Sequence, residues 1–390
     1  MHQKLDEIAR GVGARMQSSE GRKELCLGCR RLLLRLNFLA FFMYAGAIFV
    51  AFAGMRYLGE QNMFFAFCIY WPPLVWFLPA VGLAFTSVCL LDWRTFVGLV
   101  VVSGTVILLP LGWRPPRTTN VNTPPPAGKL ALTILTNNRG QDKGEKGESI
   151  RTFMNTMKPD IMAFQESAGM APRYKADPGY ADFPHAAGVG EFVLLSKHPI
   201  IAMELVPLRP EGDVAGGSWP VVAARFVVEA GGRRVVIYNV HAPTPRDTLR
   251  YYMRGAFLYG IFGLPGTPWA ARKQEGEKGW HQRISLMEAL LERARQEKEP
   301  TVLTGDFNMP ECGYLHSVVS SVFADSHSEA GEGFGFTFPG TTRNPLSFGG
   351  PWMRIDHIFF APDEWRCIWS LAEPQRKSQH RAVVARLILR

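Results

Sequence analysis

TVLTGDFNMP, residues 301–310, joins a short apolar run to a turn that carries polar side chains. The run Thr301–Thr304 predicts a buried strand. Asp306 and Asn308 stand two residues apart, a spacing that places both on one face of an extended segment and turns Phe307 into the core. A carboxylate beside a carboxamide can meet a phosphate and its attacking water, but Asp and Asn are also common in ordinary turns for backbone reasons. The remainder of the chain decides between these interpretations.

The chain is unevenly composed along its length. Its 390 residues carry a formal net charge of +9 and are 47% hydrophobic, and this length allows two or three domains. The first 35 residues are basic, residues 36–113 are almost free of charge, and residues 129–390 have a mixed composition and enough length for one large core. Cys26 and Cys29 have no second pair of metal ligands nearby, which disfavours a zinc site there.

Three uncharged runs predict a membrane region at residues 36–113 with about three transmembrane helices. Leu36–Gly54 is long enough to span a bilayer, Met63–Leu91 is interrupted by prolines and is expected to be kinked, tilted or partly broken, and Phe96–Trp113 is shorter. Tryptophans in or near these runs suit interfacial anchors. A buried helical bundle is the alternative explanation.

The basic N-terminal segment, residues 1–35, predicts a cytoplasmic N-terminus for a multi-pass protein of the inner or plasma membrane. Three spans would then place the part after Trp113 on the non-cytoplasmic side. A re-entrant second run, or a third run that does not span, would reverse this. A cleaved signal peptide is not expected because the first apolar run starts late and two more follow. Residues 114–128 form a Pro-rich linker.

Between residues 129 and 390, polar side chains recur where predicted strands end. The expected strands are Leu130–Leu135, Pro159–Gln165, Glu191–Ser196, Val221–Glu229, Arg234–Val240, Thr301–Thr304, Arg354–Ala361 and Ala382–Leu389, with helices at Ser149–Met157 and Trp280–Lys298. The candidate functional residues at or beside strand ends are Asn138, Glu166, His241, Asp306, Asn308 and His380, and Asp356 lies inside an apolar strand.

Acidic and amide groups at several strand ends can converge on one cleft at a sheet edge. A carboxylate such as Glu166 can hold a hard divalent cation like Mg²⁺ through oxygen, and such a cation neutralises phosphate charge. Histidine can act as acid or base while a buried aspartate fixes its tautomer. Taken singly, Asp356 could form a structural salt bridge and His380 could cap a turn. Their joint occurrence favours phosphate chemistry.

The motifs and their order resemble the endonuclease/exonuclease/phosphatase superfamily, which includes DNase I, exonuclease III, neutral sphingomyelinases and inositol polyphosphate phosphatases. The resemblance covers residues 130–390 and suggests a membrane-anchored, bacterial-type member. It implies an α/β fold, a four-layer α/β sandwich of two packed mixed β-sheets flanked by helices, preceded here by the transmembrane region. It also implies Mg²⁺- or Mn²⁺-dependent in-line hydrolysis of a phosphoester.

The first three motifs of the resemblance concern the metal and the phosphate. LTNNRG makes Asn138 the metal-site amide, with Asn137 as the less favoured choice. FQES makes Glu166 the metal ligand. YNVHAP makes His241 a phosphate contact.

The last three motifs carry the remaining catalytic residues. GDFNMP, the most specific, makes Asp306 the group that orients or deprotonates the water and Asn308 a phosphate binder. RIDHIFF makes Asp356 the partner of the final histidine. SQHRAVVARL makes His380 the catalytic histidine.

One position departs from the pattern. Gln379 stands where the superfamily usually has the aspartate of Ser-Asp-His, at the metal side of the cleft. Glutamine brings no charge, so we expect weaker metal binding or a changed metal preference. An active, membrane-anchored phosphodiesterase or nuclease is the favoured function. A catalytically impaired binding or scaffold protein is the alternative.

The substrate is less clearly indicated than the chemistry. Tyr251–Trp269 is an apolar, Gly-rich insertion that could be a core-packing loop or a lip that meets the bilayer or a lipid-like substrate. From the linker onward the sequence has no dense Lys/Arg cluster with interleaved aromatics, so a groove for duplex DNA is not obvious. The expected partner is a phosphoester, either nucleic acid or a phospholipid head group as in a sphingomyelin-type phosphodiesterase. No protein partner is evident.

Overall fold

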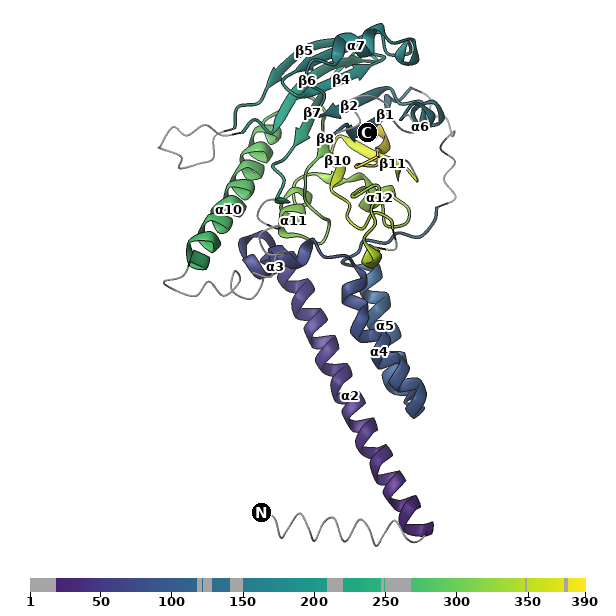
Figure 1. The fold of residues 1–390 in the computed structure, drawn as a ribbon. Helices are drawn as coiled ribbons and strands as arrows, with labels where there is room; N and C mark the ends of the chain where they lie inside the picture. Colours follow the sequence, from purple (N-terminus) through teal and green to yellow (C-terminus); the bar gives the residue numbers. More distant parts are fainter. Residues whose placement is uncertain are drawn as a thin grey trace. The chain divides into compact units, whose positions relative to one another are not determined.

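The computed structural model describes residues 19–117, 121, 128–140, 150–208, 220–246, 249, 268–347, 349–374 and 378–390 (Figure 1). The side chains of Gly21 and of residues 268–272 are outside this description, as is most of the apolar insertion 251–269. The chain divides into two compact units, Met1–Val50 with Leu74–Ile107, and Ala51–Pro73 with Leu108–Arg390. The uncharged region 36–113 is therefore shared between the two units.

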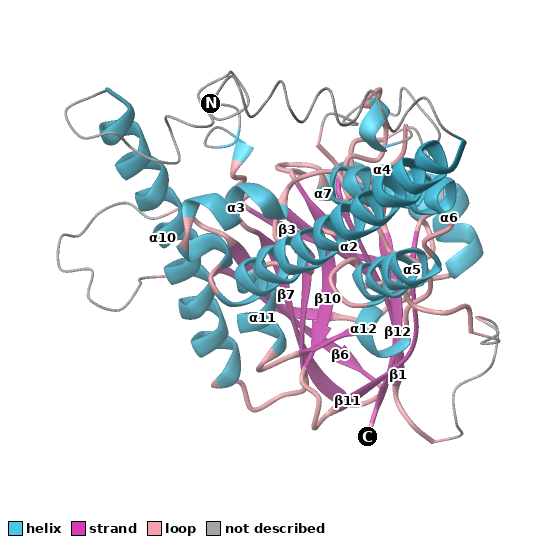
Figure 2. Ribbon diagram, turned by 90° about the horizontal axis from the view of Figure 1, so that it is seen from below, coloured by secondary structure: helices cyan, strands magenta, loops and turns pink. Residues whose placement is uncertain are grey.

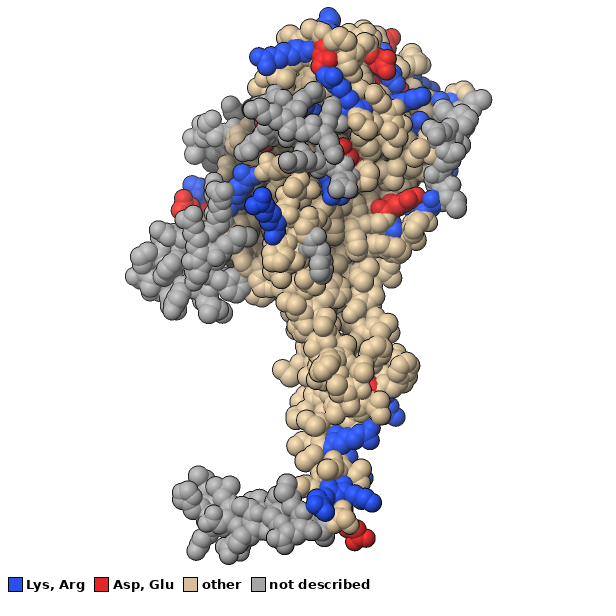
Figure 3. Space-filling model, turned by 45° about the vertical axis from the view of Figure 1, so that its right-hand side comes forward, with Lys and Arg blue, Asp and Glu red and all other residues tan. Residues whose placement is uncertain are grey.

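The first unit is built from apolar helices. They are α2 (Ser19–Tyr57), whose last turns belong to the second unit, α4 (Leu74–Leu90) and α5 (Trp93–Leu108). On the face drawn in Figure 3, Lys and Arg side chains gather near the N-terminal end of α2, and few charges appear along the rest of these helices. Asn37 is buried among them, donating to Ser87 Oγ at 2.9 Å and accepting from Thr86 Oγ1 at 2.7 Å. Such polar links fix how apolar helices pack.

One helical segment, Arg22–Tyr57, is long and apolar enough to cross a membrane. The second uncharged run is broken, as the prolines predicted. Its first part is α3 (Met63–Ile69), and α4 begins only after Pro72 and Pro73, so the two helices pass the same test only as a bent pair. Helix α5 is shorter than a span. Among the described residues the structure therefore supports one candidate span, or two if the bent pair is a single span, where about three were predicted. The sidedness of the protein stays a prediction.

The second unit contains two six-stranded sheets. One has the order β11 (Trp365–Ala372), β12 (Val383–Leu389), β1 (Ala131–Asn138), β2 (Ile161–Gln165), β4 (Phe192–Ser196), β3 (His185–Val189). The other has the order β5 (Ile200–Leu205), β6 (Ala223–Ala230), β7 (Arg233–His241), β8 (Thr301–Asp306), β10 (Asp356–Phe360), β9 (Ala324–Asp325). Both are mixed, because β1 pairs with β2 and β7 with β8 in parallel while the other pairings are antiparallel.

Helices cover the outer faces of both sheets (Figure 2). The inner faces share one core, in which Ile134 and Leu194 of one sheet pack with Phe226 and Ile358 of the other. The outer helices are α6 (Ile150–Met157) and α7 (Ala171–Ala176) against the first sheet, and α10 (Pro268–Arg295) and α11 (Tyr314–Ser320) against the second. Short helices η1 (Gly59–Gln61), η2 (Pro178–Tyr180), α12 (Ser326–Ala330) and η4 (Pro345–Ser347) complete the described elements. The predicted four-layer α/β sandwich is confirmed.

Two fully buried amides tie the sheets together. Asn239 of β7 donates to the carbonyls of Phe164, at 3.0 Å, and Val193, at 3.2 Å, in the opposite sheet. Its side-chain oxygen accepts from Gln165 Nε2 at 2.6 Å. Asn239 precedes His241 by two residues and Gln165 directly precedes Glu166, so this link fixes the ends of β2 and β7 against each other.

Replacement of Asn239 by alanine would leave the Gln165 amide and two carbonyls without this partner in the core. We expect Asn239→Ala to lower the free energy of unfolding by about 3 kcal/mol, because buried polar groups without partners are costly. Chemical unfolding of the detergent-solubilised full chain, followed by tryptophan fluorescence, measures this. Asn155→Ala, at an exposed position of α6, serves as the control and should change stability by less than about 0.5 kcal/mol. Equal stability of the two variants would contradict this role.

Candidate active site

Strand ends from both sheets meet at one pocket of about 390 Å³. Gln379 lines this pocket. So do six of the seven predicted site residues: Asn138, Glu166, His241, Asp306, Asn308 and His380. Asp356, the seventh, is fully buried directly behind His380. The structure therefore brings together side chains that are up to 242 residues apart in sequence, from Asn138 to His380.

The amide of Asn138 lies between two carboxylates. Its Nδ2 donates to Asp306 Oδ2 at 3.0 Å and to Glu166 Oε1 at 3.2 Å, and its Oδ1 accepts from the Gly140 backbone at 2.8 Å. Glu166 leaves β2 with a left-handed backbone, φ +50°, which turns it toward this amide. Asn137 is fully buried, and its Nδ2 donates to the carbonyl of His380. Of the two asparagines, Asn138 is therefore the one that faces the pocket.

The carboxylate of Asp306 is the centre of the site. It is 1% exposed, and its Oδ2 lies 3.8 Å from Nε2 of both His241 and His380. Its Oδ1 accepts from the Asn308 backbone at 2.9 Å. Asp306, Asp356 and His380 each place a possible ligand atom within 4.8 Å of the others. Buried negative charge is costly unless it is paired, so these neighbours are needed to hold Asp306 in this position.

His380 is oriented by Asp356. Its Nδ1 lies 3.1 Å from Asp356 Oδ2 and 3.2 Å from Oδ1, which leaves Nε2 to face the pocket. Burial alone would lower the pKa of His380, but the charges of Asp356 and Asp306 outweigh it and raise the pKa to about 9. Burial also raises the pKa of Asp356. The two carboxylates therefore favour the protonated form of His380.

His241 has an acidic partner that sequence reasoning missed. Its Nδ1 lies 3.0 Å from Oε1 of Glu191, the residue directly before β4. Burial lowers the pKa of His241, but Glu191 and Asp306 raise it to about 9. In the sequence, Glu191 resembles any charged residue before an apolar strand, so only the fold brings it to the site.

Asn308 reaches the pocket by a different route from the one predicted. Strand β8 ends at Asp306, and Asn308 has a left-handed backbone with φ +49°, so residues 306–308 are not one extended segment. Asparagine adopts this conformation more readily than most residues. Here its Nδ2 donates to the carbonyl of Ala242, just after β7, at 2.9 Å. Phe307 is fully buried in the core, as the pattern predicted.

Gln379 lies on the Asn138 side of the pocket. A Cβ built on Gly140 would lie 3.3 Å from the Gln379 Oε1 atom and 3.7 Å from Asn138 Oδ1. Among the described residues that line the pocket, the carboxylates are Glu166 and Asp306. An aspartate at position 379 would add a third.

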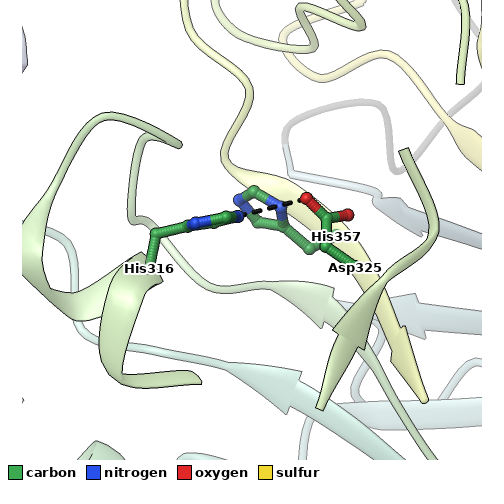
Figure 4. Close-up of side chains that lie close together, drawn as sticks. All are labelled: His316, Asp325 and His357. Carbon is green, nitrogen blue, oxygen red and sulfur yellow. Dashed lines mark hydrogen bonds and ion pairs between the residues drawn. The ribbon is translucent and has the colours of Figure 1, made fainter. Parts of the chain in front are cut away.

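A second cluster of potential metal ligands, His316, Asp325 and His357, does not fit a cation (Figure 4). His357 Nδ1 accepts from Arg354 Nη1 at 2.8 Å, and its Nε2 donates to the Met309 carbonyl at 2.9 Å. Arg354 also forms a bidentate ion pair with Asp325. Burial and the nearby Arg354 lower the pKa of His357. The guanidinium supplies the positive charge here, so the cluster is a structural network.

The sequence profile described as the Endonuclease/Exonuclease/phosphatase family matches residues 118–380. The chain belongs to this family. No curated protein matches the chain. Similar solved structures include family proteins from Bacteroides thetaiotaomicron (16% identity, 67% of this chain and 99% of that one, TM-score 0.46) and Bacteroides vulgatus (16%, 67% and 100%, 0.47). Sphingomyelinase C from Streptomyces griseocarneus is another (18%, 66% and 99%, 0.40).

The raised pKa of His241 makes stability depend on pH. In the folded protein the pKa of His241 is about 9, above the ordinary value of 6.5. Protonation of His241 therefore stabilises the fold fully below pH 6.5, and this stabilisation is lost as the pH rises toward 9. Glu191→Gln removes the partner that raises this pKa. With EDTA present, the free energy of unfolding falls as the pH rises from 6.5 to 9. We expect this fall to be about 1 to 3 kcal/mol smaller in the variant than in the wild type. His380 keeps its own contribution in both proteins.

Chemical unfolding of the full chain at several pH values measures this dependence. Glu229→Gln, at an exposed position of β6, removes a carboxylate elsewhere and should keep the wild-type slope. A wild-type slope in Glu191→Gln would show that the His241–Glu191 contact does not control this titration.

Proposed function

We propose that this protein is a membrane-anchored phosphoester hydrolase, a phosphodiesterase or nuclease that depends on Mg²⁺ or Mn²⁺ and uses in-line attack by water. The observation that carries the proposal is the meeting of Asn138, Glu166, Asp306 and His380 in one pocket. Family membership supports hydrolase chemistry in general. The apolar helices would hold the catalytic unit at the membrane, on the non-cytoplasmic side if the chain crosses it three times.

The donor set around Asn138 fits a hard divalent cation. Glu166 and Asp306 offer carboxylate oxygens, and both are held by the same Asn138 amide at 3.2 Å and 3.0 Å. The two carboxylates converge on one neutral donor, and oxygen ligands are those that Mg²⁺ prefers. When bound there, the cation would neutralise charge on the phosphate and the leaving group.

The remaining polar side chains have distinct roles in this proposal. Asp306, between the two histidines, orients or deprotonates the attacking water. With pKa values raised to about 9, His241 and His380 carry positive charge at neutral pH and suit contact with a phosphate anion. Asp356 holds Nδ1 of His380 so that Nε2 points at the phosphate. Asn308 binds a phosphate oxygen.

A phospholipid or sphingomyelin-type phosphodiester is the second candidate substrate, and the lining of the pocket favours it. Much of its lining is apolar or aromatic, and Arg246 is the one Lys or Arg among the described lining residues; the apolar and aromatic residues are Tyr70, Leu249, Phe338, Trp352, Met353 and Ile355. An apolar wall suits the part of a lipid next to its head group, whereas a nucleic-acid groove is expected to be strongly basic.

Hydrolysis should depend on His380 and Asp306. We expect His380→Ala and Asp306→Ala each to lower kcat at least about 100-fold, since both act on the reacting groups. The full-length protein is assayed on an aryl phosphodiester, single- and double-stranded DNA and phospholipid vesicles, with Mg²⁺, Mn²⁺ or EDTA. His185→Ala, on the edge strand β3, is the histidine control and should remain active.

Unchanged rates in either active-site variant would refute the assigned site. A folded wild-type protein without turnover on any of these substrates would favour the binding or scaffold alternative. The substrate that is turned over separates a nuclease from a lipid phosphodiesterase.

Gln379→Asp tests the position that departs from the family pattern. If this residue faces the metal, a third carboxylate should tighten Mn²⁺ binding about tenfold, because opposite charges attract strongly in a buried site. Calorimetric titration of the full-length protein with MnCl₂ measures this affinity without requiring turnover. Asn155→Asp adds the same charge on α6, away from the pocket, and should leave the affinity unchanged. Equal affinities in all three proteins would place position 379 outside the metal site.

A further inference from the structure

A segment from the uncharged region belongs to the catalytic unit. Residues 51–73 cluster with residues 108–390, and Figure 1 shows α3 beside α11. The buried carboxylate of Glu60 accepts from the Leu315 backbone at 3.1 Å, at the start of α11. Trp352 Nε1 donates to the carbonyl of Tyr70 at 3.4 Å. The segment is therefore attached to the catalytic unit at both ends of α3.

Tyr70, directly after α3, contacts the active-site turn. Its hydroxyl donates to the carbonyl of Asn308 at 2.9 Å and accepts from Arg283 Nη1 at 3.2 Å. Arg283 Nη2 donates to the same Asn308 carbonyl at 2.7 Å. Tyr70 is 7% exposed and Arg283 is 5% exposed, and Trp280 packs against both. Hydrogen bonds in such a buried place are well defined in direction.

These contacts hold one side of a strained residue. Asn308 is left-handed, a conformation that costs free energy for residues other than glycine. Asp306 Oδ1 holds its N–H, and the two donors from Tyr70 and Arg283 hold its C=O. These contacts fix both peptide groups of Asn308 and so its Cα–Cβ direction, and the Nδ2–Ala242 carbonyl bond at 2.9 Å holds the carboxamide itself.

We propose that Tyr70 is a positioning residue of the active site. Together with Arg283 it holds the Asn308 carbonyl, fixes the left-handed turn after β8 and aims the Asn308 carboxamide at the phosphate. The part of the proposal that concerns catalysis rests on the proposed function, because the target of the carboxamide is the phosphoester. It follows that the segment between α2 and α4 is required for efficient hydrolysis, although its composition is that of a membrane segment.

Tyr70→Phe removes only the hydroxyl. In the full-length protein, we expect kcat to fall about tenfold or more while KM changes little, because a displaced catalytic group weakens transition-state contacts. Tyr238→Phe is the matched control. The Tyr238 hydroxyl donates to Glu297, just after the C-terminal end of α10, at 2.7 Å and is not part of the pocket lining, so its loss should lower stability and leave kcat unchanged.

A double-mutant cycle separates positioning from direct substrate contact, since Tyr70 also lines the pocket. Asn308→Gly removes the carboxamide and keeps the left-handed backbone accessible. If Tyr70 acts through the carboxamide, Tyr70→Phe should have no further effect on kcat in the Asn308→Gly background. The full tenfold loss in that background would overturn the positioning role.

Hydrogen exchange gives a readout that does not need turnover. Tyr70→Phe should speed exchange in peptides that cover residues 305–311 about fivefold, as expected for loss of one hydrogen bond, and Tyr238→Phe should not. If Tyr70→Phe speeds exchange but the wild-type protein hydrolyses none of the substrates, the Tyr70 contact is retained and the proposed function is refuted. Unchanged exchange together with unchanged kcat would refute the inference itself.

Discussion

The buried carboxylate of Asp306 is the constraint around which the site is built. It ends β8 in one sheet, and Asn138 at the end of β1 in the other sheet donates to it. Since an unpaired buried charge is costly, the two sheets must bring these ends together for the fold to be stable. His241 and His380 approach the same oxygen, Oδ2, each with Nε2 at 3.8 Å. The catalytic geometry and the closure of the sandwich are therefore one arrangement, and Asn239 secures it from within the core.

The parts of the site that could be predicted from sequence are those encoded locally. Strands that end in a polar residue identify Glu166 and Asp306 because the apolar run and the polar group are adjacent in the chain. Glu191 and Arg283 could not be found in this way, since their roles come from neighbours 50 and 25 residues away in the chain, His241 and Asn308. The unpredicted strands β3, β5, β9 and β11 are the edge strands of the two sheets, and β9 has only two residues. An edge strand pairs on one side only, so its place depends on a neighbour that the local sequence does not specify.

Hydropathy is the least reliable guide for α3, the short apolar helix between α2 and α4. A run without charges predicts burial in an apolar surrounding, but lipid and protein core satisfy that requirement equally well. Helix α3 follows Asn62, which caps it, and ends at Tyr70, whose hydroxyl finds its partners in the catalytic unit. The contact of Arg114 with Gly333 likewise ties the start of the Pro-rich linker to that unit. A fragment that begins at Leu130 would omit both attachments and Tyr70, which lines the pocket.

The charge count around the pocket bears on the meaning of Gln379. Each raised-pKa histidine has its own acidic partner, Glu191 for His241 and Asp356 for His380. The Asn138 side of the pocket holds the carboxylates of Glu166 and Asp306, and Asp306 also lies 3.8 Å from Nε2 of both histidines. Arg246 lines the same pocket. A third carboxylate at position 379 would add negative charge to this side, which favours a bound cation. If the pocket binds a divalent cation as proposed, glutamine at position 379 would weaken that binding and leave Glu166 and Asp306 in place, which favours the proposed hydrolase over a scaffold protein.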